Sequence, residues 1–390
     1  MATNQGISLA VKPEGSPVAG HYFEDTGSFL LHGAAPSGGT ATVWSAHAGG
    51  WVRAAAVTVD STGHWRATKP VTDAGSWHFI ATLGAGNPGT SSTTKSAEVT
   101  VTVRPEMIKL KPPNPTVDAL KNPVVSGRVY PATGGVVVHF QVSHAESGWH
   151  NKAKVSTDKD GRFAFRFTTG TGYVRSYSVR AMYWDDRGSK WVTSSAKPIT
   201  RIKVIDAVVT ATTAADVADT YHSGCPVGPS GLRTIRLNYY GMDQRMHRGV
   251  IIVATRRVDS VVGAFRIALN NGYRIRQMTN PNHWGGSDVK QMEDDNSSGF
   301  NCRKVTGNPY AESPHSYGIA IDVNTRENPY HAANGTWYPA SGASYIKRSP
   351  HRTGMLSKTS ALTVAFRHRG YFWGGLWSPG TDYQHFEYDG

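Results

Sequence analysis

The chain has 390 residues, which is too long for one ordinary domain and favours two or three. It carries 41 Lys and Arg residues against 28 Asp and Glu residues, a formal charge of +13. This surplus attracts anionic surroundings, such as nucleic acid, an anionic cell-wall polymer or a membrane surface. The alternative is a basic, soluble surface with no dedicated partner.

The sequence lacks the patterns that are typical of several classes of protein. No run of Lys and Arg forms a basic arm, and no helix-turn-helix, RNP or zinc-finger motif supports nucleic-acid binding. No stretch approaches the roughly 18 apolar residues of a membrane span. The first residues, MATNQGISLAVKPEGSP, lack the basic start and apolar core of a secretory signal peptide. We therefore expect that a signal was removed, or that the protein reaches its site by another route, as phage-encoded lytic proteins do.

The first half of the chain contains an internal repeat. Trp51 precedes Asp60 by nine residues, and Trp149 precedes Asp158 by the same spacing. In each copy a glycine follows the aspartate and an aromatic residue follows the glycine, at matching distances. Apolar and polar residues alternate, and VDSTG and TDKDG are typical of hairpin turns. A repeat of about one hundred residues predicts two small β-sandwiches.

We place these sandwiches at residues 1–104 and 105–205, with a proline-rich linker near 104–115. The pattern resembles the tandem immunoglobulin-like (Ig-like) modules of bacterial surface and secreted proteins. Neither copy carries a catalytic pattern. Some strand tryptophans either stack on sugars or, as is more usual, belong to the core: Trp51, Trp149 and Trp191.

After a second linker near 205–220, residues 220–390 have a different pattern. Apolar residues recur with a helical period over 257–272, where Asp259 is an N-cap candidate and Gly272 can end the helix. A second helix is predicted within 357–370, beginning near Ser357 or Thr359. Strands are predicted at 249–254, 318–323 and 385–388. This mixture predicts an α+β domain, so the fold class is multidomain: two all-β sandwiches followed by an α+β domain.

The two cysteines, Cys225 and Cys302, are too far apart for a zinc ribbon or a CxxC redox motif. A disulfide between them would close a long loop and stabilise the fold by about 4 kcal/mol in the chain-entropy model. Two free buried thiols are the alternative. The extracellular character of the rest of the chain favours the disulfide.

A histidine motif near the C-terminus carries the chemistry. In SPHSYGIAIDVN, His315 and Asp322 are seven residues apart, which suits a loop histidine followed by an aspartate on the next strand. His385 comes from a second strand, and Asp382 lies three residues before it. Two His and one Asp are the ligands that catalytic zinc takes. A further carboxylate can take a proton from water, so the set suits metal-assisted amide hydrolysis.

The sequence around these residues resembles that of the zinc D-alanyl-D-alanine carboxypeptidases and of their L-alanyl-D-glutamate endopeptidase relatives. These are the VanY-like enzymes that cut peptidoglycan stem peptides. The resemblance covers about residues 220–390. The phrases that carry it include GCPV, DDNSSGFNCR, ENPY and GYFWGGLW. The matching residues are Ser313, His315, Gly318, Ala320, Asp322, Gly374, Gly375, Trp377, Asp382, His385 and Phe386.

The resemblance implies one Zn²⁺ per chain, held by His315, Asp322 and His385. It implies Asp382 as the general base, where many relatives carry Glu, and Arg303 as the arginine that holds the substrate carbonyl or stabilises the oxyanion. Three further residues are candidates for substrate binding, with a capping or packing role as the alternative for each: Ser313, Tyr317 and Trp377.

The function that follows is a zinc-dependent peptidoglycan peptidase acting outside the cell, such as a phage lysin or tail-associated lysin. The exopeptidase and endopeptidase alternatives both remain open. The Ig-like modules would dock the enzyme on the wall, with anionic wall polymer or phage virion proteins as partners. The rival is a non-catalytic, zinc-containing adhesin or phage tail binding protein, in which the modules are the working part.

Overall fold

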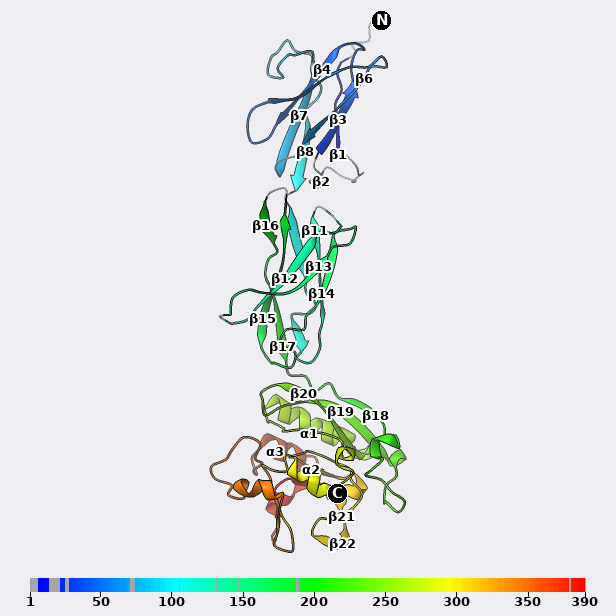
Figure 1. Ribbon diagram of the computed structural model, residues 1–390, viewed down its shortest axis with the longest axis vertical. Helices are drawn as coiled ribbons and strands as arrows, with labels where there is room; N and C mark the ends of the chain where they lie inside the picture. Colours follow the sequence, from blue (N-terminus) through cyan, green and yellow to red (C-terminus); the bar gives the residue numbers. More distant parts are fainter. Residues whose placement is uncertain are drawn as a thin grey trace. The chain divides into compact units, whose positions relative to one another are not determined.

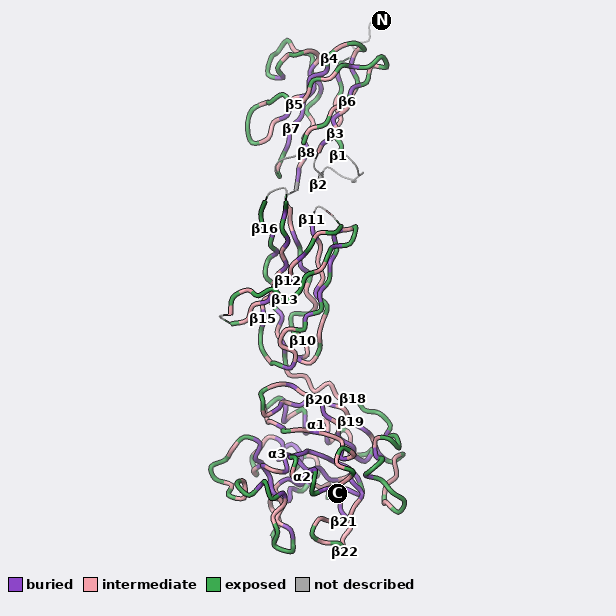
Figure 2. Tube along the Cα trace, in the orientation of Figure 1, coloured by how far each residue is buried: buried purple, intermediate pink, exposed green. Residues whose placement is uncertain are grey.

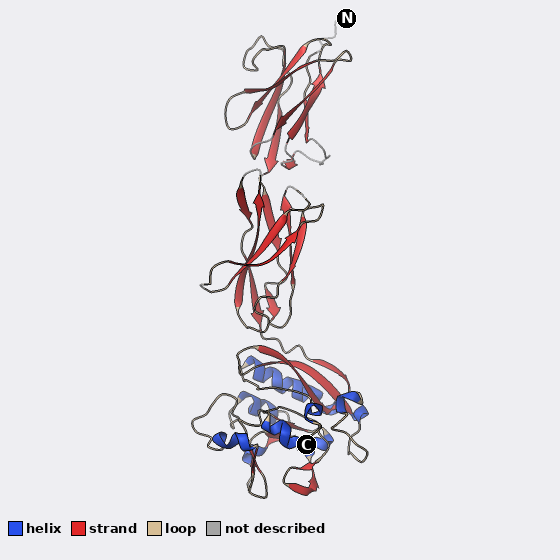
Figure 3. Cartoon of the chain, viewed as in Figure 1, coloured by secondary structure: helices blue, strands red, loops and turns tan. Residues whose placement is uncertain are grey.

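A computed structural model describes residues 6–13, 22–24, 28–70, 74–104, 106–130, 132, 134–145, 147–186, 189–378 and 380–389. Figure 3 shows strands throughout and helices only in the C-terminal region. The chain forms two compact units. The second contains Thr200–Gly390 together with Thr116–Asn122 and Gly170–Ser176. The expected fold class is confirmed, with two Ig-like β-sandwiches followed by an α+β region, whereas the exact domain boundaries stay predictions.

The first sandwich packs a three-stranded sheet against a five-stranded one (Figure 1). Its core side chains alternate along the strands, as half-buried strands require, and include Phe29, Leu31 and Phe79. The sheets are β1(Ala10–Pro13)-β3(Ser28–Ala34)-β6(His64–Pro70) and β2(Tyr22–Glu24)-β8(Val99–Arg104)-β7(Gly75–Leu83)-β4(Thr40–Ala46)-β5(Val52–Thr58).

The second sandwich repeats this plan. Phe140 and Phe165 stack between its two sheets with ring centroids 4.8 Å apart. The sheets are β14(Arg162–Arg166)-β11(Val124–Tyr130)-β9(Met107–Lys111) and β10(Thr116–Asp118)-β17(Lys197–Ile202)-β15(Ser176–Asp185)-β12(Val137–Ser143)-β13(His150–Ser156), with β16(Lys190–Thr193) also paired to β15.

The repeated turn of the two sandwiches has one mechanism. The Asp60 Oδ1 accepts hydrogen bonds from the backbone N–H groups of Thr62 and His64, both at 2.9 Å. Asp158 accepts in the same way from residues two and four positions later, at 2.9 and 2.8 Å. Gly63 and Gly161 follow with φ of 81° and 73°, a conformation that favours glycine. Turns are present at both predicted positions, but the prediction of hairpins is wrong, because each turn connects strands of different sheets: β5 pairs with β4 and β6 with β3, and β13 pairs with β12 and β14 with β11.

In the C-terminal region, α1 packs on a three-stranded sheet and α3 packs on α1, and Figure 2 shows buried residues along this sheet and these helices. The sheet is β18(Val208–Ala211)-β19(Leu232–Tyr240)-β20(Met246–Ala254), and the helices of the region are α1(Val258–Asn270), α2(Asp288–Glu293) and α3(Ala361–Arg367). The smaller sheets are β23(Ala320–Asp322)-β28(His385–Tyr388)-β26(Tyr371–Trp373), β25(Trp337–Tyr338)-β24(Tyr330–His331)-β27(Thr381–Asp382) and β21(Lys304–Val305)-β22(Asn308–Glu312).

Short 3₁₀ helices connect these elements: η1(Ala215–Val217), η2(Pro229–Gly231), η3(Thr255–Arg257), η4(Pro281–Trp284), η5(Pro314–Tyr317), η6(Ala340–Tyr345) and η7(Gly374–Leu376). Both predicted helices are present. The predicted N-cap at Asp259 is wrong, because η3 runs directly into α1 and makes Arg257 the N-cap residue. The second helix begins after Ser360, later than expected. Among the helices of the described residues, none has the length and apolar character to cross a membrane.

Candidate metal centre and active site

Three acidic and imidazole side chains meet where β23 and β28 pair. The two strands are antiparallel, and Asp322 lies directly opposite His385 in their register. Residues opposite one another in a sheet project to the same face, so the pairing brings both side chains together. His315 comes from η5, which ends at Gly318 with φ of 66°. A Cβ at Gly318 would lie 2.6 Å from the backbone nitrogen of Ala254, so only glycine allows this approach.

The distances within this cluster are short and the three residues are buried. His315 Nε2 lies 3.1 Å from Asp322 Oδ2, and His385 Nδ1 lies 3.0 Å from Asp322 Oδ1. The two facing imidazole nitrogens are 3.3 Å apart. The exposed fractions are only 2%, 3% and 4% for His315, Asp322 and His385. One ligand atom from each residue lies within 4.8 Å of the others, which is a spacing that one metal ion can bridge.

Outer hydrogen bonds orient both rings toward the cluster. His315 Nδ1 lies 2.6 Å from the carbonyl oxygen of Gly299, which can only accept, so Nδ1 carries the proton. On His385, Nε2 lies 3.2 Å from Glu387 Oε2 and donates to that carboxylate. Neutral rings in these tautomers direct lone pairs from His315 Nε2 and His385 Nδ1 toward Asp322. A converging set of two nitrogens and one carboxylate fits a zinc ion.

The charges of the cluster are strongly coupled. Burial alone would raise the pKa of Asp322, but His315 and His385 outweigh burial and hold this pKa well below its usual range. For His385, burial acts downward, yet the hydrogen bonds to Asp322 and Glu387 raise its pKa to about 10. The cluster therefore favours positive charge at its centre.

Asp382 lies on β27 and is 7% exposed. Burial raises its pKa to about 8; His385 opposes this shift, whereas Asp322 and Asp288 add to it. Within the described part of the chain, its Oδ1 has no hydrogen-bond partner. A Cβ at Gly374 would lie 2.7 Å from the backbone oxygen of Asp382, so glycine here permits close packing of η7 on β27. A buried carboxyl with a raised pKa and one oxygen that has no partner among the described residues suits a general base.

Arg303 lies beside this centre and is paired with an acidic residue. Its Nη2 is 2.7 Å from Asp288 Oδ1, and its Nη1 is 3.4 Å from the Ser313 hydroxyl. The Nε of Arg303 is buried and has no partner among the described residues. Ser313 is the N-cap of η5 and also accepts from the His315 backbone N–H at 3.3 Å. The buried Nε–H of Arg303 is thus a donor available to a ligand acceptor.

A small cavity of about 60 Å³ unites most of the predicted site residues. Trp377 is among its walls, and its ring lies 5.3 Å from that of His385. Tyr317 is 41% exposed and is not among the residues that line the cavity, so its role stays a prediction. The lining residues are Asp288, Arg303, Val305, Thr306, Ser313, Pro314, His315, Asp322, Tyr330, Trp377, Asp382, Gln384 and His385.

Sequence reasoning missed four polar members of this wall: Asp288, Thr306, Tyr330 and Gln384. Asp288 holds Arg303, and it also accepts from the Thr306 hydroxyl at 2.6 Å. The Gln384 side chain donates to the sulfur of Met292 at 3.3 Å and leaves its buried oxygen without a partner. Its position between Asp382 and His385 was the available signal. Tyr330 pairs through its backbone with Asp382.

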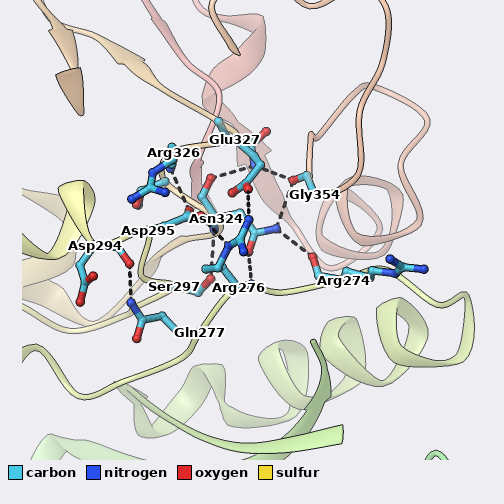
Figure 4. A network of polar contacts seen from close by, with 12 residues as sticks. Arg274, Arg276, Gln277, Asp294, Asp295, Ser297, Asn324, Arg326, Glu327 and Gly354 are labelled. Carbon is cyan, nitrogen blue, oxygen red and sulfur yellow. Dashed lines mark hydrogen bonds and ion pairs between the residues drawn. The ribbon is translucent and has the colours of Figure 1, made fainter. Parts of the chain in front are cut away.

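A polar network supports the strand that carries Asp322 (Figure 4). Arg276 donates to Asp295 at 3.1 Å and to Glu327 at 2.9 Å, and both carboxylates are 1% exposed. Its backbone N–H donates to the Asn324 side chain at 2.9 Å. Burial, together with Asp295, raises the pKa of Glu327 to about 7. The network fixes the segment that follows Asp322 in the chain.

The structure joins Cys225 to Cys302 by a disulfide, with Cα atoms 6.0 Å apart and a sequence separation of 77. Cys302, one of the two bonded residues, directly precedes Arg303 in the chain. His222 Nε2 lies 3.7 Å from the Cys302 sulfur. Because both sulfurs are bonded to each other, this trio does not offer thiolate ligands to a metal.

Residues 306–388 match the family model described as D-alanyl-D-alanine carboxypeptidase. The match contains His315, Asp322, Asp382 and His385, and it supports a peptidase domain in the C-terminal region. It begins after Arg303. A comparison with curated proteins finds no match.

Three solved structures with detectable similarity are the following. A tetra-tandem repeat in the extending region of a large adhesion protein has 12% identity and a TM-score of 0.25, covering 64% of this chain and 63% of that one. The D0-D1 domain of intimin has 14% identity and a TM-score of 0.20, covering 46% and 93%. Invasin, a bacterial integrin-binding protein, has 12% identity and a TM-score of 0.22, covering 62% and 47%. This chain thus spans less than two thirds of the length of the adhesion-protein repeat and of invasin.

Proposed function

We propose that the chain is a zinc-dependent peptidase that hydrolyses amide bonds in the stem peptides of peptidoglycan. The observation that carries this proposal is the buried set of His315, Asp322 and His385, in which outer hydrogen bonds turn both rings toward the same point. The family match over residues 306–388 supports the substrate class.

In this proposal His315 Nε2, His385 Nδ1 and an oxygen of Asp322 hold the metal. Zinc bound there supplies a water of lowered pKa and polarises the scissile carbonyl. Asp382 accepts a proton from the attacking water and returns it to the leaving amine. The hydroxyl adds to the carbonyl carbon, the C–N bond breaks, and the amine leaves with the transferred proton. The raised pKa of Asp382 makes the protonated form accessible near neutral pH.

The remaining polar groups would position the peptide. The unpartnered Nε–H of Arg303 donates to a substrate carbonyl, while Asp288 keeps the guanidinium in place. Ser313 is close enough to Arg303 to share this role, and Trp377 provides an apolar wall. Tyr317 would act at the rim, because it is exposed outside the cavity.

The rival function is a zinc-containing binding protein of the adhesin or phage-tail type, in which the sandwiches do the work. Asp382 favours the enzyme, because a structural zinc needs no buried carboxyl beside it with an oxygen that lacks a partner among the described residues. In the enzyme, the sandwiches would hold the protein on the wall outside the cell, as in a phage lysin or a tail-associated lysin.

Mass spectrometry of purified peptidoglycan tests these alternatives, with digestion by the full-length protein in the presence and absence of a chelator. Chelator-sensitive release of D-alanine establishes a carboxypeptidase. Chelator-sensitive cleavage between L-Ala and D-Glu, or at a cross-bridge, establishes an endopeptidase. An absence of new products across several wall types would favour the binding protein instead.

A further inference from the structure

The second sandwich exposes two tryptophans on the outward face of one sheet. Trp184 on β15 is 44% exposed and Trp191 on β16 is 46% exposed, although tryptophan is highly buried on average. The two residues are opposite one another in the strand register, and their rings meet edge to face at 5.5 Å. His139 on β12 contacts Trp191 at 5.2 Å, and Val137 beside it is 49% exposed. We call these four residues the Trp184–Trp191 face.

Cations and amides adjoin this face. Lys154 is opposite His139 in the register, and Lys152 and Lys154 are both exposed. Arg180 lies over the Trp149 ring at 4.2 Å. It also donates to Gln141 at 2.7 Å.

The strands that form and flank the Trp184–Trp191 face carry no exposed carboxylate. Across β12, β13, β15 and β16, all of whose residues are described, the one carboxylate is Asp185. It is buried on the inward side of β15. Beyond these strands, Asp186 directly after β15 is exposed, and Glu106 pairs with Lys190 of β16 at 3.5 Å. The aromatic surface is therefore flanked by exposed cations on its β13 side.

In the first sandwich, the position equivalent to the Trp184–Trp191 face is covered by another segment of the chain. Its strand β4 has a bulge between Val43 and Trp44, as β12 has between Phe140 and Gln141. Counting from the bulge, the pair Thr42 and Thr82 corresponds to His139 and Met182. Both threonines are at most 1% exposed.

The covering segment of the first sandwich runs over residues 84–95. Its Gly86 carbonyl accepts from the Thr82 hydroxyl at 2.9 Å, and its Thr94 carbonyl accepts from the backbone N–H of Leu83 at 3.0 Å. In the second sandwich, the corresponding segment forms the β15–β16 hairpin and presents Trp184 and Trp191 to solvent.

The ends of the two segments are held identically. The backbone N–H of Ala81 donates to the Ser96 hydroxyl at 3.0 Å, and Ala181 donates to Ser194 at the same distance. Each serine N–H also donates back to the alanine carbonyl at 2.9 Å. The scaffold is thus the same, and the intervening sequence alone exposes the tryptophans. A large exposed aromatic patch on an otherwise well-packed domain marks an interaction surface.

We propose that the Trp184–Trp191 face binds an anionic, sugar-containing polymer of the cell wall that bears phosphate groups. Flat indole rings offer apolar surface for the C–H faces of sugar rings. Lys152 and Lys154 provide charge for the phosphates, and no carboxylate on these strands opposes an anion. That the polymer belongs to the cell wall rests on the proposed function, whereas binding to the polymer does not require hydrolysis.

Cosedimentation of the full-length protein with purified sacculi tests this inference, using walls before and after hydrofluoric acid removes the phosphate-bearing polymers. We expect binding to intact sacculi to weaken at least tenfold after extraction. The double variant Trp184→Ala/Trp191→Ala should weaken binding to intact sacculi to a similar extent. Lys152→Ala/Lys154→Ala should weaken it less and make the remaining binding less sensitive to salt. Equal binding to extracted and intact walls would overturn the assignment of the polymer.

The matched control is Val124→Ala, which removes an apolar side chain of similar exposure, 49%, from the other sheet of the same sandwich. It should leave wall binding unchanged; a loss as large as that of the tryptophan variant would remove the case for this face. Hydrolysis of soluble stem peptide separates the two proposals. The tryptophan variant should keep wild-type hydrolysis. A protein that binds walls through this face and hydrolyses no peptide would refute the proposed peptidase and leave this inference intact.

Discussion

The sandwiches and the C-terminal region place polar groups differently. Along β15 of the second sandwich, inward residues are mostly apolar and outward residues are polar or exposed. The interior of the C-terminal region instead contains carboxylates and imidazoles, several with displaced pKa values, and two of the carboxylates have one oxygen without a partner among the described residues. These buried ionisable residues are Asp288, Asp295, His315, Asp322, Glu327, Asp382 and His385. Burying charge is costly, so a region that retains so much of it is the region where chemistry is expected.

The largest difference between the two regions should appear in the rate of hydrolysis. Asp382→Asn is expected to lower kcat by about 10²- to 10⁴-fold, the usual contribution of a general base, while zinc content stays unchanged. Steady-state kinetics on stem peptide and metal analysis measure the two quantities. Asp160→Asn, a change to a surface carboxylate on a sandwich turn, is the control and should have wild-type kinetics. Full activity of the Asp382 variant would refute the assigned base.

The next largest difference between the two regions should appear in how much zinc stabilises them. At a zinc concentration about 1,000 times Kd, the wild-type C-terminal region should gain about 4 kcal/mol of unfolding free energy. His315→Ala should lose both this gain and bound zinc, because it removes one of three ligands. Denaturant titration with and without chelator measures the gain. His64→Ala on a sandwich strand should retain it. Zinc-dependent stabilisation that survives in the His315 variant would place the metal elsewhere.

Charge pairs should differ in strength according to burial. Arg276→Ala leaves two carboxylates at 1% exposure without their cation, and we expect a loss of about 3 kcal/mol of unfolding free energy at neutral pH. Arg162→Ala removes an exposed partner of Asp160 and should cost less than about 1 kcal/mol. Urea denaturation of both variants provides the test. Equal costs would show that the Arg276 network is no more important than a surface pair.

The last expected effect is the contribution of Glu327 to the pH dependence of stability in the C-terminal region. Burial and Asp295 raise the pKa of Glu327 in the folded protein from 4.5 to about 7. The folded state therefore holds this proton more tightly, and the contribution of Glu327 to stability should fall as pH rises from 4.5 to about 7. Glu327→Gln cannot ionise and should flatten this part of the stability profile. An unchanged profile in the variant would assign the dependence to other groups.

The sequence predicts most of the metal centre because its signals are local. His315, Gly318 and Asp322 lie within one short segment, and the backbone needs of η5 and β23 are readable from it. Asp288 and Tyr330 come from distant segments without any periodic pattern, so their approach to Arg303 and Asp382 depends on tertiary packing. The N-cap assignment failed for a related reason, since a preceding 3₁₀ turn replaced the local capping signal at Asp259.

The two serine anchors, Ser96 and Ser194, make the segment between fixed strand positions an exchangeable part. Because the anchors, the bulge and the core are shared, replacing residues 84–95 with residues 184–193 changes the surface of a sandwich without touching what holds its sheets together. A lineage that duplicates such a sandwich can therefore acquire a new ligand by altering one hairpin, while selection on the fold is unaffected. The same exchange gives protein engineers a graft site that lies outside the C-terminal region.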